Sequence, residues 1–257
     1  MMPADGPMSS LVQRIARQAL ATFRSPGDGS ARSFLENHDK LRGLMTEVRS
    51  SDLNLAADAR PRGGSSTRGG GAPRPPVSYM HICETDHFSM GVFLLQSGAC
   101  IPLHDHPGMH GVLKVLYGKA RIRCFDRLQL QQIRPMHEPG SSMHPLPEVP
   151  AAQVGALRRS VLRSCADYTE LSGPCVLEPE RDNLHQIHAV DGPAAFMDIL
   201  APPYDPDQGR DCHYFREVEV GGVEVQEQGQ EVWLMEISQP PDFWCGGEPY
   251  PGPEVQL

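Results

Sequence analysis

The chain has 257 residues, of which 39% are hydrophobic, and its formal net charge is -9 at neutral pH. The negative charge argues against a protein that binds nucleic acids or anionic membranes. No apolar run approaches transmembrane length or resembles the core of a signal peptide, so we expect neither. The 25 glycines and 25 prolines favour many turns and short strands over long helices.

The seven cysteines are odd in number and include no C-x-x-C pair, which argues against a disulfide framework or a structural zinc module. We therefore expect free thiols and a cytoplasmic protein. One alternative stays open, because Arg14, Arg17 and Arg24 lie on a helical pattern with no acidic residue between Asp5 and Asp28. A mitochondrial transit peptide has that composition, although a structural helix is the favoured interpretation.

Two helices are predicted at the start of the chain. Apolar residues at helical spacing over 9–24 predict the first. The string SFLE, beginning at Ser33, reads as a capping box that opens a second helix ending near Val48. We expect residues 1–59 to form a helical segment that packs on the following domain.

Residues 60–76 are rich in Gly, Ser, Arg and Pro, and we predict them to be a flexible loop. The residue pattern changes after this loop. Residues 77–257 contain short apolar runs broken by turn residues, with Asp191-Gly192 and Gly221-Gly222 as hairpin-type turns. They predict a mainly β domain, an antiparallel sandwich or barrel, with an irregular surface loop at 127–156 and a surface tail from Gln239. The expected strands are 77–83, 88–96, 100–106, 111–117, 120–125, 159–168, 175–177, 184–190, 194–200, 211–220 and 223–237.

The stretch from Gly98 to Asp126 contains the candidate metal ligands His104 and His106. Side chains two residues apart on an extended strand point to the same face. Imidazole is the commonest protein ligand for mid-to-late first-row metals. We expect these histidines on a β-hairpin closed by the glycine turn at Gly118, inside a barrel.

Other histidines are available as further ligands. His185 and His188 lie in the later apolar string NLHQIHAV, and their spacing of three allows at most one to face inward. His110 lies near the first pair after a Pro-Gly break, and His213 follows Cys212. The residues alone leave the choice among them open.

Gly98-x5-His104-x-His106, closing at Gly118, resembles the first motif of the cupin superfamily. The glutamate that normally follows the second histidine is missing, and His110 and Gly111 stand in that region. The strings IPLHDHPGMHGVLKVLYG, NLHQIHAV and AAFMDILAPPYD, together with LVQRIARQALATFR, resemble the family of cysteamine (2-aminoethanethiol) dioxygenases and plant cysteine oxidases, which are three-histidine thiol dioxygenases.

The resemblance implies a cupin-type antiparallel β-barrel, jelly-roll-like, with the N-terminal helices packed outside. It implies that His104, His106 and His185 hold Fe(2+), and the shared string NLH favours His185 over His188. The stretch from Pro179 to His185 differs from the general second cupin motif, because it is one residue longer and lacks the glycine. The motif therefore supports His185 less strongly than the first motif supports His104 and His106.

The same resemblance implies an iron-dependent oxidoreductase that adds both atoms of O2 to a thiol and yields a sulfinate. Expected substrates are cysteamine, converted to hypotaurine, and peptides or proteins with an N-terminal cysteine. An oxygen-sensing role in N-degron protein turnover would follow. We expect a monomer with no nucleic-acid or membrane partner.

Four further residues are candidates for the site. Cys212 and Tyr214 share a strand face, and related thiol dioxygenases join a cysteine and a tyrosine by a thioether near the iron. Asp198 is an acid within the apolar run AAFMDILA, placed to bind an iron histidine or a substrate amine. Tyr204, in PPYD, is expected to line the entrance. Ordinary core or edge positions are the alternative for each.

Two other function classes compete. A cupin-like metal-binding or interaction module would act through partner contacts without turnover. A metal-dependent sugar isomerase is disfavoured by the missing glutamate and by the lack of a basic cluster for phosphate.

Overall fold

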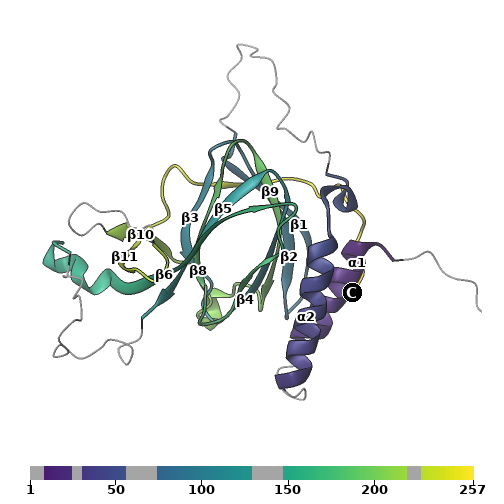
Figure 1. Cartoon of the computed structure of the whole chain (residues 1–257), viewed down its shortest axis with the longest axis horizontal. Coiled ribbons are helices and arrows are strands. Elements are labelled where there is room, and N and C mark those ends of the chain that lie inside the picture. Colours follow the sequence, from purple (N-terminus) through teal and green to yellow (C-terminus); the bar gives the residue numbers. More distant parts are fainter. Residues whose placement is uncertain (1–8, 25–30, 56–73, 129–146, 219–226) are drawn as a thin grey trace, which may run out of the picture.

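The computed structural model describes residues 9–24, 31–55, 74–128, 147–218 and 227–257 (Figure 1). Most of the predicted loops at 60–76 and 127–156, and the Gly221-Gly222 turn, lie outside these residues. The division into a helical segment, a loop and a barrel domain therefore stays a prediction.

Two helices precede the strands: α1 (Leu11–Phe23) and α2 (Ala31–Glu47), followed by a short 3-10 turn at Ser50–Leu53. Ser33 lies inside α2 rather than at its start, so the predicted capping position is wrong. The strands are β1 (Val77–Glu84), β2 (Ser89–Leu95), β3 (Cys100–Asp105), β4 (His110–Tyr117), β5 (Lys119–Arg127), β6 (Leu157–Thr169), β7 (Cys175–Leu177), β8 (Leu184–Ala189), β9 (Ala194–Ala201), β10 (Tyr214–Val218), β11 (Glu231–Ile237) and β12 (Cys245–Gly247).

The strands form two hydrogen-bonded groups. One is a six-stranded sheet in the order β12-β1-β2-β9-β4-β7, and the other is a closed ring in the order β10-β11-β6-β5-β8-β3. Neighbours run antiparallel except β1 and β12, which are parallel. The prediction of a mainly β, antiparallel, jelly-roll-like barrel is confirmed.

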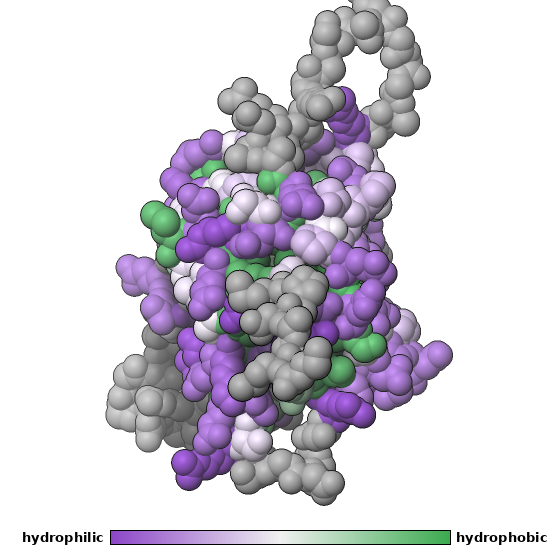
Figure 2. Space-filling model, turned by 90° about the vertical axis from the view of Figure 1, so that its right-hand side faces the viewer, coloured by the Kyte–Doolittle hydropathy of each residue, from purple (hydrophilic) through white to green (hydrophobic). Residues whose placement is uncertain are grey.

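The two helices cover the outer face of the six-stranded sheet (Figure 1). Ile15 of α1 and Leu41 of α2 are fully buried in one cluster with Val92 of β2 and Met197 of β9. Figure 2 shows that the side bearing the helices is mostly hydrophilic at its surface. The predicted packing of helices outside the barrel is confirmed, and none of the described helices is long and apolar enough to cross a membrane.

The expected hairpin around the first two histidines is wrong. β3 pairs with β8 and β10 in the closed ring, whereas β4 pairs with β7 and β9 in the other sheet. The chain crosses from one sheet to the other between β3 and β4, as it also does at Gly118 and at Asp191-Gly192. Jelly-roll connections of this kind pair strands that are distant in sequence, so a turn signal between two apolar runs did not indicate a hairpin.

The C-terminal tail does more than lie on the surface. Its segment Cys245–Gly247 adds β12 to the edge of β1, a strand that the sequence pattern did not indicate. The tail ends against α1, where the Gln13 side chain donates to the Gln256 carbonyl at 2.9 Å and accepts from the Gln256 amide at 2.9 Å. The tail therefore closes one side of the barrel before it reaches the helices.

Candidate metal centre and its cavity

Three buried histidines meet inside the barrel. His104 on β3 is the register partner of His185 on β8, and His106 lies just beyond the end of β3. Their possible ligand nitrogens all lie within 4.8 Å of one another. His188 is exposed on the opposite face of β8, as the spacing of three predicts.

Hydrogen bonds determine which nitrogens of His104 and His106 are free. His104 Nδ1 lies 2.8 Å from the Pro102 carbonyl, which only accepts, so Nδ1 carries the proton. The Tyr204 hydroxyl donates to the Asp105 carbonyl at 2.9 Å, and it therefore accepts from His106 Nδ1 at 2.7 Å. In both rings, the unprotonated Nε2 is left to bind a metal.

Burial favours the neutral form of all three rings. Burial lowers the pKa of His104, and it lowers the pKa of His106 and of His185 well below the usual range. His106 Nε2 and His185 Nε2 lie 3.0 Å apart. Two nitrogens that each lie about 2.1 Å from one ion, at a right angle, would be about 3 Å apart. The spacing of these two nitrogens therefore fits two ligands of one metal ion.

Asp105 and Asn183 hold the segment that carries these histidines. Asp105 is buried, accepts from the His213 amide at 2.9 Å and forms an ion pair with Arg127 at 2.7 Å. The Asn183 side chain accepts from the His106 amide at 3.2 Å and donates to the His106 carbonyl at 2.7 Å. These bonds position the backbone on both sides of the His106 ring.

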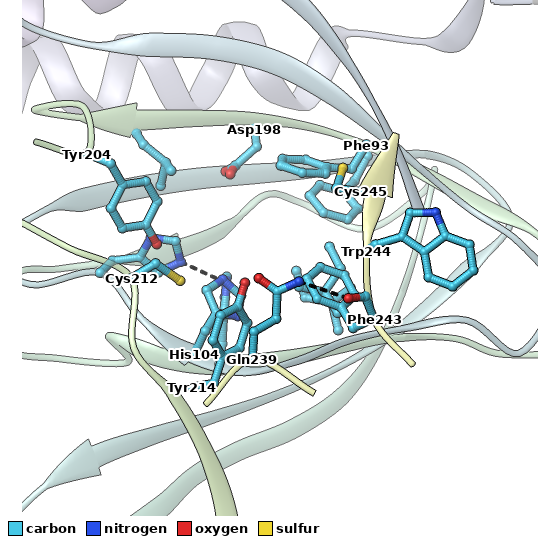
Figure 3. Close-up of a pocket in the computed structure, with 16 residues that line it drawn as sticks. Phe93, His104, Asp198, Tyr204, Cys212, Tyr214, Gln239, Phe243, Trp244 and Cys245 are labelled. Carbon is cyan, nitrogen blue, oxygen red and sulfur yellow. Dashed lines mark hydrogen bonds between the residues drawn. The ribbon is translucent and has the colours of Figure 1, made fainter. Parts of the chain in front are cut away.

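The histidines open into a cavity of about 480 Å³, drawn in Figure 3. Its walls are mostly apolar or aromatic, and the C-terminal tail contributes Gln239, Phe243, Trp244 and Cys245. Tail residues were not predicted as part of the site, because composition marks Pro- and Gly-rich ends as surface segments. The size suits a small molecule or the end of a peptide.

Asp198 lies in the wall across the cavity from His104 (Figure 3). It is in the middle of β9, and burial raises the pKa of its carboxyl to about 7. Its Oδ1 has no hydrogen-bond partner among the described residues. No described residue of the three-histidine group is hydrogen-bonded to this oxygen.

Cys212, Tyr204 and Tyr214 form a group beside the histidines (Figure 3). All three side chains line the same cavity as the histidines. Burial raises the pKa of the Cys212 thiol. The spacing of two residues predicted that Cys212 and Tyr214 share a face, whereas the hydrogen bond from His106 Nδ1 to the Tyr204 hydroxyl had no sequence signal.

The two remaining candidate histidines lie elsewhere. His110 packs among aromatic side chains of the helices, with its ring centroid 5.9 Å from that of Phe23 and 5.1 Å from that of Phe34. His213 is 3.2 Å from Asp105 through its Nδ1. Neither belongs to the three-histidine group.

Residues 44–255 match the family model PCO_ADO. The chain belongs to the PCO_ADO family. The chain is 56% identical to 2-aminoethanethiol dioxygenase of Mus musculus, and 54% identical to the Homo sapiens protein of that name, each over 99% of both chains. It is 28% identical to plant cysteine oxidase 1 of Arabidopsis thaliana, over 99% of this chain and 83% of that one.

Membership of PCO_ADO confirms the expectation of an enzyme of the thiol dioxygenase class. Among solved structures, KdgF from a Halomonas species is similar with 11% identity and a TM-score of 0.32, covering 53% of this chain and 88% of that one.

Proposed function

We propose that this PCO_ADO member is an iron(II)-dependent dioxygenase that converts cysteamine and N-terminal cysteine residues to sulfinates. One observation carries the proposal: three buried imidazoles converge in a small cavity, with no carboxylate among the donors that the described residues provide. Carboxylate-containing iron sites already hold an anionic ligand. A three-imidazole site leaves that position to an anionic substrate, and a thiolate fits it.

The reaction balances without an added reductant. The thiol RSH and one O2 give RSO2H, with both oxygen atoms bonded to sulfur and the four electrons supplied by the sulfur atom. Iron bound to His104, His106 and His185 would supply the one-electron chemistry through which O2 reacts with a thiol. The protein residues orient the substrate and limit access of water.

Asp198 is proposed to bind the substrate ammonium group. Cysteamine and an N-terminal cysteine share the unit in which a thiol and an amine are separated by two carbons. With the sulfur at the histidines, the amine is directed to the facing wall, where Asp198 Oδ1 has no partner among the described residues. An ammonium group would stabilise the ionised carboxylate, which burial alone disfavours.

Cys212 and Tyr214 are proposed to form a thioether beside the iron. A sulfur atom near a tyrosine, in a site that reacts with O2, supports this bond. Its formation removes one hydrogen from each side chain and needs an oxidant, which O2 provides. Tyr204 is a positioning residue, since it acts through the His106 ring.

We further propose that the enzyme acts as a cytoplasmic monomer and contributes to oxygen-dependent turnover of proteins that begin with cysteine. The relatives named plant cysteine oxidase support cysteine as the group that is oxidised, and those named 2-aminoethanethiol dioxygenase support cysteamine.

The deciding experiment is mass spectrometry of a peptide with an N-terminal cysteine after incubation with the Fe(II) protein in air. We expect a gain of two oxygen atoms on the cysteine, both derived from labelled O2. A protein that binds zinc and leaves the peptide unchanged would instead be a metal-binding module.

A further inference from the structure

A second cavity, of about 210 Å³, adjoins the first and is assigned no role above. Both cavities are lined by Phe93, Asp198, Leu200 and Tyr204. The second cavity extends from these residues toward the end of β1 at Glu84. A molecule that occupies the first cavity therefore has an adjoining space on the far side of Asp198.

The register of β1, β2 and β9 creates this space. Gly91 of β2 is the register partner of Asp198 of β9, and Glu84 of β1 is the partner of Ser89 of β2. The Tyr79 ring lies directly over Gly91, where a Cβ atom would come within 2.3 Å of the ring. Glycine at this position therefore leaves room for the ring, which lines the cavity.

The lining of the second cavity is suited to a long cationic side chain. Tyr79, Phe93 and Tyr204 provide aromatic walls, along which a lysine or arginine stem can pack. Glu84 is exposed on the lining toward the end of β1. Among the described lining residues, none carries a positive charge.

An extended peptide would bring its second residue close to Asp198. Consecutive Cα atoms are about 3.8 Å apart, so residue 2 of a peptide lies next to the group that binds the N-terminal ammonium. Asp198, which we assign to that ammonium, is shared by both cavities. The side chain of residue 2 would then lie beside the second cavity.

We propose that the second cavity is the binding subsite for the residue that follows an N-terminal cysteine, and that Glu84 makes it favour lysine or arginine there. This inference rests on the proposed peptide substrate, and it adds the sequence preference of that substrate. Cysteamine, which has no second residue, leaves the subsite empty.

The test compares three peptides that differ only at residue 2, which is glycine, lysine or glutamate. For each protein variant, kcat/KM is measured by mass spectrometry of the doubly oxygenated product and divided by the value for the glycine peptide. This ratio cancels any loss of active protein. The variants are wild type, Glu84→Lys and, as a matched control, Asp86→Lys. Asp86 is exposed in the connection that follows β1, two residues after Glu84, and does not line the cavity.

We expect wild type to prefer the lysine peptide over the glutamate peptide by about fivefold, since a partly solvated ion pair changes affinity by a small factor. Glu84→Lys should reverse the preference, and Asp86→Lys should keep it. Equal rates for the lysine and glutamate peptides in wild type, or the same reversal in Asp86→Lys, would overturn the subsite alone. If wild type oxygenated none of the three peptides, the proposed function would fail as well.

Discussion

The two facing walls of the main cavity differ in how their polar groups are satisfied. On the histidine wall, His104 and His106 are each oriented by a hydrogen bond to Nδ1, and the backbone of His106 is bonded on both sides to Asn183. On the opposite wall, Asp198 is as deeply buried, yet one carboxyl oxygen has no partner among the described residues.

This difference separates two tasks. A metal needs ligands whose direction and protonation are determined before it binds, and the hydrogen bonds of the histidine wall provide both. A substrate group needs a partner that is still free, and an unpaired buried carboxyl costs stability until that group arrives. The comparison predicts that changes on the first wall remove the metal, whereas changes on the second wall leave the metal in place and weaken substrate binding.

The largest effect is expected from His104→Ala. Loss of one of three imidazoles should abolish iron binding and reduce thiol-dependent O2 uptake to background, while the circular dichroism of the barrel stays that of wild type. His188→Ala is the matched control, because this exposed histidine lies on the other face of β8. Full iron loading and wild-type turnover in His104→Ala would remove this histidine from the metal site.

Asp198→Asn should have the second largest effect. The amide keeps the shape but lacks the charge that binds an ammonium group, so we expect kcat/KM for cysteamine to fall about 10- to 100-fold with iron content unchanged. The pKa of about 7 means that the carboxylate forms as pH rises. In wild type, kcat/KM should therefore increase through pH 7, and this rise should be absent in Asp198→Asn.

Asp198→Asn also tests how much the buried carboxyl group lowers the stability of the fold. Because the pKa of Asp198 is higher in the folded protein than in the unfolded chain, the folded state holds more protons between about pH 4 and pH 7. The free energy of unfolding therefore falls as pH rises through that window. Asp198→Asn should be less sensitive to pH there, and iron loss or an unchanged pH profile of kcat/KM would contradict the assigned role.

Much of this arrangement could be predicted from the sequence, for reasons that differ between residues. His104 and His106 share a strand face by spacing alone, and the spacing of His185 and His188 required one of them to face outward. The partnership of β3 with β8, separated by about 80 residues of chain, has no local signal. The resemblance implied that His185 joins the first two histidines, but it did not imply which strands pair.

Other features could not be predicted from local pattern. The bond from Tyr204 to His106 depends on a loop that returns to the end of β3 after 98 residues. The tail residues Phe243 and Trp244 reach the cavity because β12 adds to the edge of β1, and a three-residue strand among prolines and glycines has no clear period. Both features depend on contacts between segments that are distant in the sequence, and not on the local conformational propensity of the residues.

The smallest of the expected effects concerns Tyr204→Phe, which removes only the hydroxyl that accepts from His106 Nδ1. His106 would keep its place through Asn183, but its ring would be free to change tautomer or turn. We expect iron affinity to fall about 10-fold, with activity restored at higher Fe(II) concentration. A titration of the apoprotein with Fe(II), followed by O2 uptake at each concentration, measures both. If the hydroxyl served only the barrel fold, the variant would instead show a lower melting temperature with unchanged iron affinity. Restoration of activity by iron therefore distinguishes a group that prepares the metal ligand from one that merely fills space beside it.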